Sequence, residues 1–252
     1  MTRTVRVQNA NVCFDVARAK KNIAAFNKSA AYLAGDWLMH EFFGHLRDGR
    51  KNQPASVCAV LVNALWKTQV DREKGAAMKS PSEKPLTRVC CHLEQCIGDL
   101  RGLARRLGTN ALVNYPDNVE DGACEALRLI FEVPNVQRKN YSFTTKFLHW
   151  LSPTNFPIVD SRARNNINEL LRSHRRDCRR AYIPSGGCGT VEEDYKRWIW
   201  FYHYLLTAGM EQGWGEKLVE HDFISQSGDP IKAIRNTLLR VLDKHFWMAG
   251  SA

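Results

Sequence analysis

Long apolar runs are missing from this sequence of 252 residues. A helix that crosses a membrane needs about 18 to 20 consecutive apolar residues, and no segment approaches that length. The first residues, MTRTVRVQN, also lack the apolar stretch of a secretory signal. We therefore expect no membrane association and a cytoplasmic location.

Metal-ligand spacings are also missing, although the chain has 8 cysteines and 8 histidines. His40 and His45 stand about 140° apart on a helix, whereas a shared zinc ion needs ligands one turn apart. Cys90 and Cys96 lack the Cys-x-x-Cys spacing of zinc sites, and Cys96 fits the apolar face of a helix. We expect reduced cysteines, no metal and no cofactor.

Basic residues are abundant, with 36 Lys and Arg against 26 Asp and Glu and a net charge of +10. Such an excess favours a polyanionic partner, for which double-stranded DNA is the expected candidate, although a soluble basic enzyme has the same composition. Five arginines follow helical spacing and would form one stripe if a helix continued to about Cys178: Arg172, Arg175, Arg176, Arg179 and Arg180. The stripe would bind phosphates, or it is simply a solvated face.

Apolar residues recur at helical spacing along most of the chain. The pattern predicts helices over 57–70, 89–107, 117–131, 142–151, about 160–178, 191–208 and 230–246. Asp117 with Glu120, and Thr190 with Glu193, have the spacing of a capping box. Only the first sixteen residues favour extended chain. The expected fold class is mainly α, in a single unit over 1–252.

One lysine and one carboxylate stand out between two expected helices. Lys146 lies among Phe143, Phe147 and Trp150, where desolvation should lower the pKa of its amine. Asp160 falls at the start of the next helix, where free N–H groups favour a carboxylate. An available amine beside a fixed anion suits attack on a sugar carbon that carries positive charge in the transition state. The simpler interpretation is a helix-capping aspartate and a lysine whose stem packs on apolar neighbours.

The segment from Ser142 to Arg162, SFTTKFLHWLSPTNFPIVDSR, resembles the active-site stretch of the helix-hairpin-helix DNA glycosylases, in particular bacterial proteins with the 8-oxoguanine DNA glycosylase fold. The resemblance implies that Lys146 is the Schiff-base lysine and Asp160 the essential aspartate. A weaker match, LWKTQVD, implies that Gln69 enters the DNA stack. The Gly-hydrophobic-Gly turn is replaced by Ser-Phe-Thr, so the implied hairpin at 135–162 is degenerate.

The resemblance covers roughly 55–180 and implies a glycosylase core, on which aromatic helices from 181–252 would pack. The residues expected to bind DNA are Gln69, Ser142, Thr144, Arg162, Arg172, Arg175, Arg176 and Arg179. An excised base must leave the stack, so aromatic and polar side chains should line a base pocket, with His149, Trp198 and Tyr202 as candidates. Packing in the core is the alternative for each of the three.

The implied activity is excision of a damaged or modified base to leave an abasic site, with strand nicking if an imine forms on the lysine. Oxidised guanine and a hypermodified phage cytosine, such as glucosylated 5-hydroxymethylcytosine, are both candidate targets, so DNA repair and antiviral defence both stay open. A monomer is expected. Two alternatives remain: a non-catalytic nucleic-acid-binding module of the same fold, and a metal-dependent nuclease, for which clustered carboxylates are missing.

Overall fold

The computed structural model describes residues 1–49, 54–70, 84–133, 140–184, 189–226 and 233–249. The chain begins with an antiparallel hairpin of β1 (Thr2–Val7) and β2 (Ala10–Asp15), in which Val7 pairs with Ala10. Alternate residues of β2 are buried, which is the pattern of a strand with one face on the core. The extended N-terminal segment is therefore confirmed.

Helices make up most of the remaining described chain, so the expected mainly α fold class is also confirmed. Their bounds are α1 (Val16–Asn27), α2 (Ala30–Arg47), α3 (Ala55–Trp66), α4 (Pro85–Leu107), α5 (Ala111–Asn114), α6 (Pro116–Phe131), α7 (Tyr141–Leu151), α8 (Ser161–Leu170), the 3₁₀ turn η2 (Arg172–His174), α9 (Val191–Glu211), α10 (Trp214–Ser225) and α11 (Leu238–Ala249). No helix in these ranges is long and apolar enough to span a membrane.

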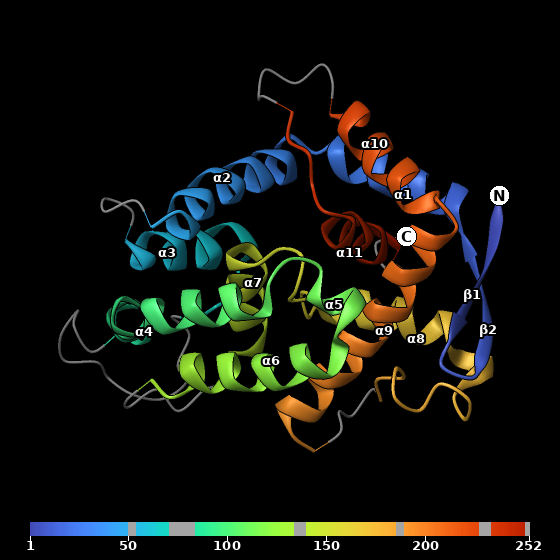
Figure 1. Ribbon diagram of the computed structural model, residues 1–252. Coiled ribbons are helices and arrows are strands. Elements are labelled where there is room, and N and C mark those ends of the chain that lie inside the picture. Colours follow the sequence, from blue (N-terminus) through green and yellow to red (C-terminus); the bar gives the residue numbers. More distant parts are fainter. Residues whose placement is uncertain (50–53, 71–83, 134–139, 185–188, 227–232, 250–252) are drawn as a thin grey trace.

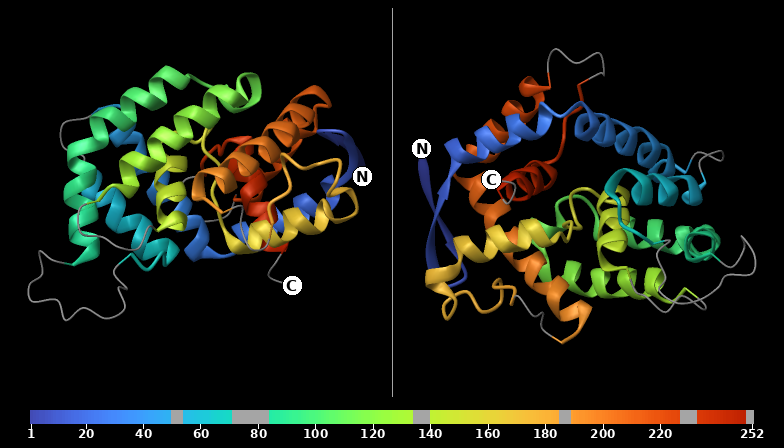
Figure 2. Two further views of the ribbon diagram at one scale, coloured as in Figure 1. Left: turned by 90° about the horizontal axis from the view of Figure 1, so that it is seen from below. Right: turned by 180° about the vertical axis from the view of Figure 1, so that it is seen from behind.

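The two ends of the chain lie together in space. Helices α2 to α7 gather on one side of the molecule, whereas the hairpin, α1 and α8 to α11 form the other side (Figures 1 and 2). The first helix, α1, packs against α10 and α11, and α11 also packs against α8. Buried apolar residues from both sides form one continuous core.

Helix α7 is an interior helix. It packs against α2, α3 and α6, and every residue from Phe143 to Leu151 is buried. Aromatic contacts fix it in place, with the ring centroids of Phe43 and Phe147 5.1 Å apart. Lys146 belongs to this buried stretch, so its amine is held at a defined place.

A network of charged side chains is buried where α2, α10 and α11 meet. Arg240 donates to Asp36 at 2.6 Å and also pairs with Asp243. Lys244 lies 3.1 Å from Asp36 and 2.8 Å from Asp222, and none of these five side chains is more than 4% exposed. Because each charge has an opposite partner within hydrogen-bond range, the network can persist inside the core.

Several predicted helix boundaries are wrong. Helix α3 ends at Trp66 rather than at Val70. Helix α8 ends at Leu170 rather than near Cys178. The residue that precedes α6 is Tyr115, and no side chain caps that helix, so the capping box predicted at Asp117 does not form. The last helix begins at Leu238, and residues 233–237 of its predicted range are not helical; residues 230–232 lie outside the described chain. The cap predicted at Thr190 is confirmed, since its side chain accepts from the backbone N–H of Glu193.

Candidate active site

The structure brings Lys146 and Asp160 together. Lys146 Nζ lies 3.8 Å from Asp160 Oδ2, and the two side chains are 8% and 18% exposed. The amine therefore lies beneath the surface while the carboxylate remains partly open to solvent. This is the juxtaposition that the chemistry proposed from the sequence requires.

Lys146 has few polar neighbours. Its amine donates to Ser142 Oγ at 2.9 Å, and the centroid of the Trp66 ring lies 5.9 Å away. Burial lowers the pKa of Lys146, and the charge of Arg240 lowers it further, while Asp160 and Asp243 oppose the shift. Neutral amine is therefore more available here than at an exposed lysine, and neutral amine is the nucleophilic form.

Asp160 is held at the N-terminus of α8. Its Oδ1 accepts from the backbone N–H of Arg162 at 2.8 Å, and this leaves Oδ2 directed to Lys146. The preceding residue is also fixed, because the backbone N–H of Val159 donates to Thr145 Oγ1 at 3.1 Å. Thr145 stands next to Lys146 on α7, so one hydrogen bond ties the segment of the aspartate to the helix of the lysine.

A cleft of about 550 Å³ opens at Asp160, and Lys146 lies behind the carboxylate instead of lining the cleft. Its walls come from the turn after α3, the start of α7 and the start of α8: Lys67, Thr68, Gln69, Asn140, Tyr141, Ser142, Val159, Asp160, Ser161 and Arg164. Gln69 and Ser142 were predicted as DNA contacts, and the structure places both in the cleft that holds Asp160. Sequence reasoning missed Asn140 and Arg164, although Arg164 stands one helical turn after Asp160.

The turn that carries Gln69 has an unusual backbone. Lys67 and Gln69 have φ angles of 48° and 58°, in the left-handed region that residues other than glycine rarely adopt. The side chain of Asn63 accepts from Val70 N and from Thr68 Oγ1, both at 3.0 Å. Asn140, which caps α7, holds the same turn from the other side through Thr68 O at 2.5 Å. Strain of this kind persists where the surroundings impose it, and such sites are often functional.

The buried carboxylate of Asp243, from the charged network, acts electrostatically on the pair. Burial raises the pKa of Asp243 to about 6, the nearby charge of Asp160 adds to this, and Arg240 and Lys146 oppose it. Tyr202 is also buried, and the charges of Asp243 and Asp160 help to raise its pKa. Tyr202 is thus within electrostatic reach of Asp160, but it is 0% exposed and does not line the cleft. No local signal marks Asp243, because its neighbours come from distant parts of the chain.

Four expected contacts are contradicted by burial in the core. Thr144 is 1% exposed and cannot contact DNA. His149 is fully buried, its Nδ1 lies 2.8 Å from Phe156 O, and burial lowers its pKa to about 3. Trp198 is 1% exposed and stacks on Tyr202 with a centroid distance of 6.2 Å. His149, Trp198 and Tyr202, which is 0% exposed, are therefore packing residues rather than walls of an accessible base pocket.

The predicted arginine stripe does not form, because α8 ends before it. Arg172 pairs with Glu169, and Arg175 lies over the ring of Tyr182 at 5.1 Å. Arg176 and Arg179 are exposed in the turns that follow η2. These arginines lie beyond the C-terminal end of α8, whereas Asp160 lies at its N-terminal end.

Two further arginines have specific neighbours. Arg180 pairs with Asp117 at 2.7 Å and with Glu120 at 3.4 Å. Arg162 is exposed at the start of α8, with its guanidinium 4.7 Å from the centroid of the Trp247 ring. Among the arginines predicted to bind DNA, Arg162 is the one on the first turn of α8, next to Asp160.

Within the described ranges, no group of three His, Cys, Asp or Glu side chains is placed to hold a metal ion. The arrangement can supply an amine nucleophile, a fixed carboxylate and a cleft with basic side chains. Comparisons with protein-family models, with curated proteins and with solved structures found no match to this chain.

Proposed function

We propose that this protein is a DNA glycosylase that removes a damaged or modified base from double-stranded DNA. The observation that carries the proposal is the 3.8 Å approach of Lys146 Nζ to Asp160 Oδ2 at the cleft lined by Gln69. The helical fold with a degenerate helix-hairpin-helix, suggested by the resemblance of 142–162, belongs to the same proposal. Residues 134–139, which include the start of the expected hairpin, lie outside the described chain.

The chemistry follows from the two side chains. As the glycosidic bond to the base breaks, positive charge develops at C1′, and the carboxylate of Asp160 stabilises it. The neutral amine of Lys146 then forms a bond to C1′, and the departing base takes up a proton. The second amine proton passes to the ring oxygen as the sugar ring opens, which gives an imine. Loss of a proton from C2′ then expels the 3′ phosphate and nicks the strand.

The cleft suits a nucleotide that has left the duplex. An enzyme that acts on a base within DNA must first take it out of the stack. Gln69 is exposed on the strained turn at the rim, so its side chain is available to fill the space left by the base. Lys67 and Arg164 add positive charge to the same walls, where the phosphates of the strand would lie.

The target base follows from the resemblance alone, and oxidised guanine and a hypermodified cytosine are both candidates. The direct experiment is a screen of duplexes that carry one modification each, with abasic sites as the readout. Excision of an oxidised guanine favours a role in repair, whereas excision of glucosylated 5-hydroxymethylcytosine favours a role in defence against phage.

Asp160→Asn separates an enzyme from a binding module. Asparagine keeps the size and the capping ability of the side chain but loses the negative charge. We expect excision to fall by about a hundredfold or more, with DNA binding retained. Wild-type protein that binds modified duplexes without releasing any base would instead identify a non-catalytic module.

The role of Lys146 is tested by trapping with borohydride, which reduces an imine to a stable covalent bond between protein and DNA. We expect a trapped complex with the wild-type protein and none with Lys146→Ala. Lys196→Ala is the matched control, because Lys196 pairs with Glu193 on the surface of α9 and should trap normally. Base release by Lys146→Ala without trapping would indicate attack by water, with Asp160 as the remaining catalytic residue.

A further inference from the structure

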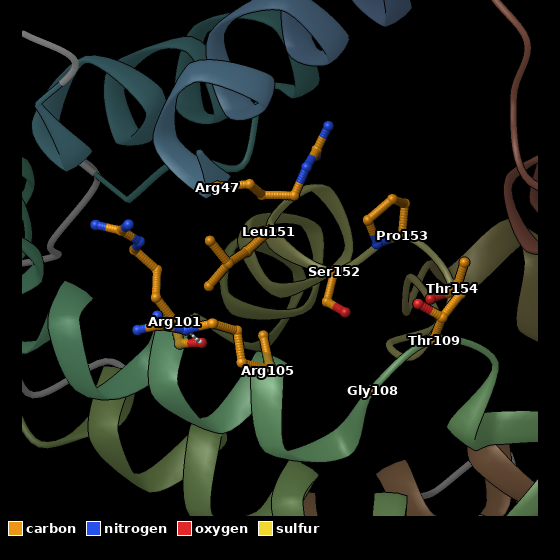
Figure 3. Close-up of a pocket in the computed structure, with 10 residues that line it drawn as sticks. Arg47, Arg101, Arg105, Gly108, Thr109, Leu151, Ser152, Pro153 and Thr154 are labelled. Atoms are coloured by element: carbon orange, nitrogen blue, oxygen red, sulfur yellow. Dashed lines mark hydrogen bonds between the residues drawn. The ribbon is translucent and has the colours of Figure 1, made fainter. Parts of the chain in front are cut away.

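A second cavity, of about 410 Å³, lies apart from the cleft. Figure 3 shows side chains that reach it from two directions, with Arg47 from the end of α2, Arg101 and Arg105 from the last turns of α4, and the end of α7 between them. Ser142 and Leu151 are nine residues apart on α7, which corresponds to about 14 Å along a helix. The cavity is therefore at the opposite end of α7 from Ser142 and the cleft.

The charge of this cavity is unbalanced. The lining contains three arginines and no acidic residue. In the described part of the chain, no carboxylate lies within ion-pair distance of Arg47, Arg101 or Arg105. Their neighbour Arg106, by contrast, pairs with Glu125 at 3.1 Å. Three like charges around one space repel one another, and an anion between them removes that cost.

The donors of these arginines are only partly used. Arg47 donates to Trp150 O at 2.6 Å, and Arg105 donates through Nε to the backbone oxygen of Arg101 at 3.3 Å. Arg101 Nε is buried without a hydrogen-bond partner. Burial also lowers the pKa of Arg47, so its charge is held in a partly desolvated place. Buried donors without acceptors are unfavourable unless a ligand accepts from them.

The backbone makes room for one of these side chains. Gly49 has a φ of 69°, and a Cβ atom at this position would collide with the guanidinium of Arg101. Glycine suits the left-handed conformation of the turn, and its lack of a side chain leaves room for the guanidinium of Arg101. The guanidinium is held against the backbone at the end of α2 instead of extending freely into solvent.

The remaining walls fit a small organic phosphate. Leu151 and Pro153 supply apolar surface, whereas Thr109 and Ser152 supply hydroxyl groups. The carbonyl of Gly108, also in the lining, accepts a hydrogen bond from Asn155 at 2.6 Å. A volume of about 410 Å³ is within the range of small-molecule sites. Arginine forks match the oxygen atoms of phosphate groups.

We propose that this arginine cavity is a binding site for a phosphorylated small molecule of nucleotide size, with the phosphates on Arg101 and Arg105 and the organic part on Leu151 and Pro153. The site is separate from the cleft of Lys146 and Asp160. Occupation would also bridge α4 to the end of α7, and so it would stabilise the folded protein.

Pyrophosphate and a nucleoside triphosphate are suitable probes, titrated by calorimetry at constant ionic strength because exposed charges are screened by salt. We expect one site per chain, with the triphosphate bound more tightly than pyrophosphate. Arg101→Gln and Arg105→Gln should each weaken binding by about tenfold or more. Arg106→Gln is the matched control, since it removes one charge from the same helix outside the cavity and should leave affinity unchanged.

Equal weakening by all three variants would overturn the proposal, because it would indicate a general effect of charge. Absence of binding by either probe would also overturn it. If the probes fail while Arg101→Gln and Arg105→Gln weaken the binding of duplex DNA, the cavity contacts the DNA backbone instead. Asp160→Asn should bind pyrophosphate normally, so the result does not depend on whether the protein excises bases.

Discussion

Asp160 makes two separate contacts with one side chain. Its Oδ1 caps α8 through the N–H of Arg162, and its Oδ2 approaches Lys146. The cap keeps the carboxylate in one orientation, so the second oxygen stays directed to the amine without further support. A structural interpretation and a catalytic interpretation of this residue are therefore compatible.

Two substitutions at Asp160 distinguish these functions. Asp160→Asn keeps a capping side chain, whereas Asp160→Ala removes it, and loss of a cap costs about 1 kcal/mol. We expect the free energy of unfolding of Asp160→Ala, measured with denaturant, to be lower than that of Asp160→Asn by about 1 kcal/mol. Both variants should lose excision. Equal stability of the two variants would mean that the hydrogen bond to Arg162 contributes nothing to folding.

His149 makes stability depend on pH. Its pKa is lowered to about 3 by burial, against an ordinary value of 6.5. The unfolded chain therefore takes up a proton below 6.5 while the folded chain does not, and stability falls as the pH drops from there towards 3. Between about pH 7 and pH 5 this one residue accounts for about 2 kcal/mol of the loss.

The expected result is that His149→Gln loses about 2 kcal/mol less than the wild type over this pH range. Denaturant unfolding at both pH values measures the difference, and His174→Gln, in the turn after α8, is the control. His245, whose pKa is lowered to about 4, contributes in the same direction in both proteins and does not enter the comparison. An unchanged pH dependence of stability in His149→Gln would contradict the lowered pKa of His149.

Residues that act locally could be predicted from the sequence, and residues that act across the fold could not. Lys146 and Asp160 lie in one short segment, where apolar neighbours and a helix start indicate their environment. Asp243 approaches them from α11, near the C-terminal end of the chain. The sequence around Asp243 does not indicate that its carboxylate is buried or that it lies near Lys146. The burial of His149 and Trp198 was missed for the same reason, because both faces of their helices meet other elements.

At the scale of helices, patterns of apolar residues were more reliable than patterns of charge. The interior of α4 and the start of α9 follow from apolar spacing and a capping residue. The arginines after residue 171 follow helical spacing too, but α8 ends at Leu170. Periodic arginines supply no apolar face that would be buried by continuing the helix, so the spacing alone does not stabilise one.

The charged network that joins α2, α10 and α11 is the clearest case of an interaction between elements. Asp222 accepts from Lys244 at 2.8 Å, and both side chains are fully buried. We expect Asp222→Ala to destabilise the protein by about 3 to 5 kcal/mol, because it leaves one negative charge fewer to balance a buried lysine. The control is the surface pair of Glu220 with Arg235, because Glu220 lies on α10 like Asp222.

Glu220→Ala should cost less than about 1 kcal/mol, because exposed ion pairs contribute little. Urea unfolding of the two variants side by side measures the contrast. Similar values for both would mean that Lys244 finds another partner or loses its proton when Asp222 is removed. Asp36, at 3.1 Å from Lys244, is the remaining candidate partner.

At the scale of the whole molecule, the net charge of +10 favours a polyanionic partner. It does not indicate where on the surface such a partner would bind. The fold places Lys67 and Arg164 on the walls of the cleft, and it places Arg175 and Arg176 beyond the far end of α8. If DNA lies across the cleft, the first pair contacts phosphates and the second pair does not. The position of the DNA can therefore be determined by finding which basic side chains contact phosphates and so release counterions.

The dependence of DNA affinity on salt concentration shows which basic side chains contact phosphates. Each phosphate contact contributes about 0.9 to the slope of log affinity against log salt concentration. Lys67→Gln with Arg164→Gln should lower the slope by about 2, whereas Arg175→Gln with Arg176→Gln, which removes the same charge, should leave it unchanged. Fluorescence anisotropy with a labelled duplex at several salt concentrations gives both slopes. The opposite result, with the larger change in the second pair, would place the DNA on the surface after α8 and away from Lys146 and Asp160, and the glycosylase proposal would lose its geometric basis.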